Sequence, residues 1–246
     1  MTAQQHPLTY DAFVAHASAD PAVVGLVLKG SRAHDGMTTE HSDHDLYVVL
    51  ADGAETDLRR FGGHRTPQLD LVIVSLAGFR AAGMPGFERY ALARARVVLD
   101  RLEGGIGEIL AAKARLGADE AFRAVGGWLD AYANSLYRSL KNDRDGEALA
   151  ARLDAADSMG HLLEVLFALD RRPRPYNKYL RWELARYPLP GWDSDTLLRA
   201  VDRISASGEV EVQRGLFARV EAAARAAGHG AVLDDWGEDL LLMRPR

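Results

Sequence analysis

The sequence has no cysteine among its 246 residues. Disulfide bonds, thiolate zinc sites and cysteine nucleophiles are therefore excluded for this chain. An excess of basic residues is also missing: Lys and Arg total 30 against 35 Asp and Glu, so the formal net charge is −5, and the pI is about 5.9. Because a dedicated nucleic-acid binder usually carries a basic face, we expect no nucleic-acid partner.

Long hydrophobic runs are absent as well. The apolar runs have the length of strands, so we expect no membrane-spanning segment and no membrane partner. Residues 1–7 have neither the basic region nor the apolar run of a targeting segment. Hydrophobic residues nevertheless make up 48% of the chain, enough for the core of one large or two small domains. We expect a cytoplasmic protein, with its oligomeric state left open.

The hydrophobic pattern divides the chain into two parts. In the first part, strand-like runs are expected at 23–29, 46–50, 69–76 and 96–100, after a helix at 9–19. In the second part every pattern is helical, with helices expected at 120–141, 147–170, 176–187, 194–205, 210–227 and 233–242. The predicted fold class is α+β: a small mixed sheet with flanking helices in domain 1–105, followed by an all-α helical bundle in domain 106–246.

The candidate functional residues of the first part are a glycine-serine turn and two carboxylates. Gly30 and Ser31 directly follow the first expected strand, and Asp43 and Asp45 alternate at the start of the second. Alternation places both carboxylates on one face of a strand. Such hard oxygen ligands suit Mg²⁺, which recruits phosphates, while the turn offers backbone N–H groups and a hydroxyl to a phosphate. Asp70 stands near the start of the third strand.

This order of motifs resembles the nucleotidyltransferase superfamily, whose best-known member is DNA polymerase beta. The family pattern is a strand, Gly-Ser, a short helix, Asp-x-Asp on the next strand, and a third acid on the strand beside it. The resemblance implies a nucleoside triphosphate such as ATP as co-substrate and two Mg²⁺ ions. The catalytic and metal-binding residues that it assigns are Asp43, Asp45 and Asp70. The nucleotide-binding residues of the turn are Gly30, Ser31 and Arg32. In the family form G-S-x-A-R-G an arginine stands where this sequence has His34.

Lys178 is a further nucleotide-binding candidate. Large nucleotidyltransferases that modify small molecules, notably the aminoglycoside-modifying group, share the layout of a catalytic domain and a helical domain. Related enzymes carry a phosphate-contacting lysine early in a helix after a proline-containing turn, and Lys178 after Pro175 resembles it. An ammonium there adds to the positive end of the helix. The alternative is a surface lysine beside Tyr176 and Tyr179.

Four polar residues of the second part are spaced so as to share one helix face: Asp154, Asp157, His161 and Glu164. Such a face is usually solvated. The functional alternative is an acidic wall that binds a cationic acceptor, with Asp157, His161 and Glu164 as acceptor-binding residues.

We therefore predict an enzyme that transfers a nucleoside monophosphate, AMP from ATP, to a hydroxyl of a small molecule. An aminoglycoside-like antibiotic is the most specific acceptor that the resemblance suggests, and this would make the chain an antibiotic-resistance protein. The alternatives are a transferase of AMP to a protein and a nucleotide-binding regulator without catalysis.

Overall fold

The computed structural model describes residues 8–246 and divides the chain into two compact units, Met1–Arg115 and Leu116–Arg246. The α+β class is confirmed. The boundary between the units lies after Arg115, whereas the predicted boundary lay after residue 105. The difference arises because helix α4 (Gly105–Lys113) packs on the sheet. Its Ile106 and Leu110 lie in the same buried cluster as Val27 of the first strand.

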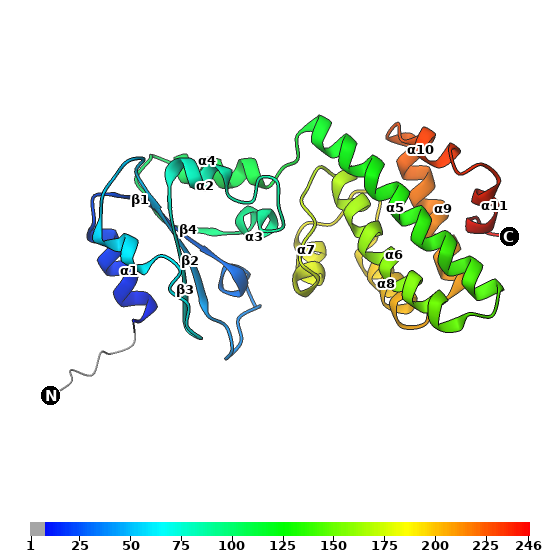
Figure 1. The fold of residues 1–246 in the computed structure, drawn as a ribbon, viewed down its shortest axis with the longest axis horizontal. Helices are drawn as coiled ribbons and strands as arrows, with labels where there is room; N and C mark the ends of the chain where they lie inside the picture. Colours follow the sequence, from blue (N-terminus) through cyan, green and yellow to red (C-terminus); the bar gives the residue numbers. More distant parts are fainter. Residues whose placement is uncertain (1–7) are drawn as a thin grey trace. The chain divides into compact units, whose positions relative to one another are not determined.

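A four-stranded mixed sheet forms the centre of the first unit, in the order β3-β2-β1-β4 (Figure 1). The strands are β1 (Val23–Lys29), β2 (His44–Leu50), β3 (Leu69–Ser75) and β4 (Arg96–Asp100). β1 is antiparallel to both β2 and β4, whereas β2 and β3 are parallel. β2 begins at His44, earlier than predicted, so Asp45 lies inside the strand and Asp43 immediately precedes it.

Each face of this sheet is covered by different helices, as the alternation of strand side chains requires. On one face, Leu46 and Val48 of β2 pack with Phe13 of α1 (Tyr10–Ala19) and with Leu58 of the short 3-10 helix η2 (Asp57–Phe61). The residues between them, such as Tyr47, pack on the opposite face with α2 (Leu76–Ala81), α3 (Arg89–Ala93) and α4. Asp45 belongs by alternation to this second face.

The second unit is entirely helical. Its two long helices, α5 (Ala118–Arg144) and α6 (Ala148–Leu169), lie side by side (Figure 1). The remaining elements are η3 (Asn177–Tyr179), α7 (Leu180–Arg186), α8 (Ser194–Ser207), α9 (Val210–Ala226), α10 (Gly230–Asp234), η4 (Gly237–Asp239) and α11 (Leu240–Met243). The single helix predicted for 233–242 is therefore wrong. Gly237 has a φ of +54°, which a continuous right-handed helix does not allow.

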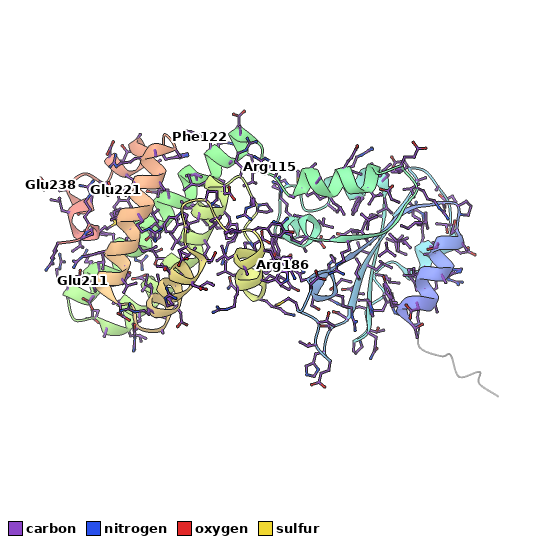
Figure 2. All side chains as sticks on the ribbon, turned by 180° about the vertical axis from the view of Figure 1, so that it is seen from behind. Arg115, Phe122, Arg186, Glu211, Glu221 and Glu238 are labelled. Carbon is purple, nitrogen blue, oxygen red and sulfur yellow. The ribbon has the colours of Figure 1, made fainter. Side chains whose placement is uncertain are left out.

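An ion-pair cluster ties the end of the chain to α9. Glu221, labelled in Figure 2, accepts hydrogen bonds from Arg225 at 2.9 Å and from Arg244 at 2.6 Å. These bonds hold the pKa of Glu221 below its usual range, with the Arg244 bond as the largest cause. Within residues 8–246, no helix is both long and apolar enough to span a membrane.

Candidate active site

Two of the predicted catalytic acids stand next to each other in the sheet. Asp45 of β2 is directly opposite Asp70 of β3 in the parallel register, and neighbouring strands are about 4.8 Å apart. In β3, Asp70 lies between Leu69 and Leu71, whose side chains belong to the cluster that packs against α1. Asp70 therefore points to the opposite face, as Asp45 does. His44 lies on that other face, with its ring stacked on Tyr10 at 4.0 Å between centroids. Both carboxylates therefore share the face away from α1.

Gly30 is the residue that makes room for Asp45. It begins the 3-10 helix η1 (Gly30–Ala33) with a φ of +73°, a conformation that favours glycine. A Cβ atom placed on Gly30 would lie 2.1 Å from Oδ2 of Asp45, far inside van der Waals contact. The close approach that this glycine permits is thus to the Asp45 carboxylate, whereas the sequence suggested an approach to phosphate.

The electrostatic environment of Asp45 is unfavourable to its charge. Burial is the largest cause that raises the pKa of Asp45, and the neighbouring charges of Asp43 and Asp70 raise it further. The Lys29 ammonium opposes these effects without cancelling them. All three predicted acids therefore interact through space, and their combined charge favours a cation beside Asp45.

Three residues of this site escaped the sequence analysis: Lys29, Tyr47 and Glu88. Lys29 Nζ lies 3.6 Å from Asp45 Oδ1 and 3.2 Å from Glu88 Oε1. The Tyr47 hydroxyl donates to Glu88 Oε2 at 2.7 Å. Alternation along β2 could have placed Tyr47 on the face of Asp45. Glu88 had no local signal, because the fold alone brings the start of α3 to the end of β1.

An open cavity of about 570 Å³ borders Asp70, one of the three predicted acids. Its lining includes Lys29, Arg65, Asp70 and Glu88. The Arg65 side chain is 82% exposed, and its Nε lies 3.4 Å from Asp70 Oδ2. Charged groups of both signs thus line a hollow at the end of the sheet where β2 and β3 begin. A ligand with phosphate groups and metal ions would find partners for both there.

The remaining residues of the Gly-Ser turn hold the loop that leads to β2. The Ser31 hydroxyl is buried and donates to Ser42 Oγ at 2.8 Å. The Arg32 guanidinium donates to the carbonyl oxygens of Ser42 and Asp43. His34, in the place of the family's arginine, is buried, with Nδ1 2.8 Å from the Gly30 carbonyl oxygen. These contacts are structural, and the phosphate roles of Ser31 and Arg32 stay predictions.

The three predicted acids offer carboxylate oxygens, which are suitable ligands for a divalent ion. The space that the missing side chain of Gly30 leaves is filled by the Asp45 carboxylate itself, whose Oδ2 would lie 2.1 Å from a Cβ atom there. As the side chains stand, however, no three His, Asp or Glu residues within 8–246 are gathered closely enough to hold a metal ion. The contacts of Asp45 with Lys29 and of Asp70 with Arg65 draw these carboxylates toward cations of the protein.

Lys178 belongs to the second unit. It is exposed in η3, and its Nζ lies 5.5 Å from the centroid of the Tyr179 ring. This is the contact that the surface-lysine alternative describes.

The acidic face of α6 is partly neutralised by arginines. Asp154 pairs with Arg138 at 3.3 Å, and Glu164 pairs with Arg174 at 3.4 Å. Burial nevertheless raises the pKa of Glu164, against the opposing effect of Arg174. Asp157 is exposed.

His161 of the same face has two neighbours on α5. Its Nδ1 is 3.2 Å from Ser135 Oγ, and its ring stacks on Trp128 at 5.7 Å between centroids. His161 therefore packs against α5, and the α6 face is less acidic than the sequence suggested.

No family model matches this sequence, and no curated protein matches it. Among solved structures, the chain is similar to a nucleotidyltransferase-like protein from Exiguobacterium sibiricum, with 14% sequence identity and a TM-score of 0.45. The similarity covers 96% of this chain and 79% of that protein.

Replacing Gly30 by alanine should lower the free energy of unfolding by more than the strain of a left-handed backbone alone accounts for. Gly53 is the matched control, because it has a φ of +75° and nothing within 4 Å of a Cβ atom. Both variants should lose about 1–2 kcal/mol for the left-handed backbone. Gly30→Ala should lose about 1–3 kcal/mol more, the scale of overpacking. Urea unfolding measures both, and equal losses would contradict the close approach to Asp45.

Asp45→Asn should stabilise the protein at neutral pH. Because the pKa of Asp45 is raised in the folded state, the ionised carboxylate costs stability above that pKa, and this cost vanishes below the ordinary pKa of aspartate. The gain in melting temperature from Asp45→Asn should therefore be largest near pH 7 and shrink as pH falls through the folded pKa. Thermal unfolding in a chelator tests this. A variant less stable than wild type at pH 7 would show that the Lys29 pair outweighs burial.

Proposed function

We propose that the protein is a nucleotidyltransferase that moves AMP from ATP to a hydroxyl of a small molecule, with its catalytic residues in the first unit. The observation that carries this proposal is the Asp45 carboxylate, packed against Gly30 and in register with Asp70. A protein built for stability alone has no need to bury a carboxylate beside two others, since each like charge makes ionisation costlier.

In this reaction the acceptor oxygen forms a bond to the α-phosphorus, the bond to the bridging oxygen breaks, and pyrophosphate leaves. Asp43, Asp45 and Asp70 would hold two Mg²⁺ ions, which supply Lewis-acid stabilisation of the phosphate charge and can activate the attacking oxygen. Asp70 has a second candidate role as the base that accepts the proton of the acceptor hydroxyl.

A second candidate is a nucleotide-binding regulator without catalysis. The observation that favours it is Lys29, whose ammonium contacts Asp45, the acid that the reaction would need for a metal ion. In such a protein the lysine would replace the metal permanently. Nucleotide binding without pyrophosphate release, at any metal concentration, is the result that this alternative requires.

Charge-neutral substitution of the acids tests the transfer reaction. Asp45→Asn and Asp70→Asn should each lower the rate of ATP-dependent pyrophosphate release by at least about 100-fold, the scale on which groups that stabilise transition-state charge act. Asp57→Asn is the control, because Asp57 is an exposed acid of the same unit in η2. Circular dichroism verifies folding. Unchanged turnover in Asp45→Asn would refute the proposed mechanism.

The acceptor class is tested with a panel of aminoglycosides, lincosamides, neutral sugars and a protein. If the α6 face binds a polycation, an aminoglycoside should be modified best, and Asp157→Asn/Glu164→Gln should lose that preference. Added salt should weaken it too. The control is Asp195→Asn/Glu238→Gln, which removes two exposed charges elsewhere in the unit. If both double variants keep the preference, α6 has only a solvated surface.

A further inference from the structure

Lys29 is the last residue of β1, and the antiparallel register places it directly opposite Asp45. Its side chain is only 16% exposed, and its ammonium lies between two carboxylates, 3.6 Å from Asp45 and 3.2 Å from Glu88. A cation held this way is screened less than one on the open surface. The ammonium thus supplies positive charge at the carboxylate that is packed against Gly30.

Glu88, at the start of α3, is itself held in place. The Tyr47 hydroxyl donates to Glu88 Oε2, while Oε1 faces the ammonium. The Lys29 ammonium also lies 5.8 Å from the centroid of the Tyr47 ring, at the outer range of a cation–π contact. Lys29 therefore has a second, fixed anionic partner and an aromatic neighbour, so it can leave Asp45 without losing every favourable contact.

The other cation next to the acids is held differently. Arg65 reaches Asp70 through an exposed contact, with 82% of its side chain accessible to solvent. Water and salt screen the exposed guanidinium of such a pair strongly. Of these two cations, Lys29 is the one whose charge acts strongly on the acids.

We propose that Lys29 is a built-in counter-cation that competes with the divalent metal for Asp45, and that Glu88 retains the ammonium when the metal binds. This inference rests on the proposed function, which requires metal at Asp45. Its physical basis is repulsion: an ammonium a few ångströms from a divalent ion lowers the affinity for that ion unless the ammonium moves away. Since Glu88 already contacts Lys29, a small displacement suffices. Lys29 and Glu88 are then positioning residues that set the affinity for metal.

The experiment is calorimetric titration with Mn²⁺, in the absence of nucleotide, of the full chain and four variants. Lys29→Met should bind Mn²⁺ roughly tenfold more tightly than wild type, because a nearby positive charge is gone. Arg65→Gln is the matched control and should change the affinity by less than about threefold, since its charge is screened. Circular dichroism and the melting temperature in a chelator verify that each variant is folded.

Glu88→Gln gives an independent test with the opposite sign. It should weaken Mn²⁺ binding, because Lys29 then has Asp45 as its remaining carboxylate partner and the metal must displace it. In the Lys29→Met background the same substitution should have a much smaller effect, since Glu88 acts through Lys29. Equal effects of Glu88→Gln in both backgrounds would overturn this role. This cycle also keeps the competition testable if Lys29→Met does not fold, because unchanged affinity in Glu88→Gln alone contradicts it.

The results also separate this inference from the proposed function. Unchanged or weaker Mn²⁺ binding in Lys29→Met overturns the counter-cation, even if the wild type releases pyrophosphate normally. The absence of Mn²⁺ binding in both proteins overturns it as well. Tighter binding in Lys29→Met supports it, even if no nucleotide is turned over. In that last case the nucleotidyltransferase proposal fails while the competition between lysine and metal stands.

Discussion

The candidate site of the first unit depends on one partly buried negative charge, that of Asp45. The Asp45 carboxylate lies at the end of the sheet between Gly30 and Lys29, in register with a second acid, Asp70. Its position depends on the absence of a side chain at Gly30 and on the positive φ that lets the chain turn there. The buried hydrogen bond from Ser31 to Ser42 holds the segment that connects this turn to β2. The turn at Gly30 and the segment that follows it thus determine where the Asp45 carboxylate lies.

The charge of Asp45 is costly to the folded state. Burial and like charges raise the pKa of Asp45, so ionisation at neutral pH costs free energy. The fold offsets part of this cost with the Lys29 ammonium, which Glu88 and Tyr47 position. A surface ion pair such as Arg65 with Asp70 contributes far less, because water screens it. Groups kept despite such a cost are typical of sites that bind or react.

The second unit has a different physical basis. Its core is formed by the amphipathic faces of α5 and α6, whose long 3.6-residue patterns are readable in the sequence. The polar face of α6 carries charges of both signs. Asp154 and Glu164 pair with arginines outside α6, Arg138 of α5 and Arg174 of the segment that follows α6, and this lowers the net charge of the face. A helical pattern shows which residues share a face, and it does not show which partners reach that face.

The sequence by itself determined the strands, the long helices and the order of Gly30, Asp43, Asp45 and Asp70, because periodicity and turn residues are local properties. It misplaced the unit boundary, since only packing shows that Ile106 of α4 completes the core of the sheet unit. It also missed Lys29 and Glu88, whose meeting depends on the register between β1 and β2 and on the path of the chain to α3. Tertiary structure alone decided that the charge opposing Asp45 comes from the protein's own lysine, because this contact depends on the register in which β1 and β2 pair.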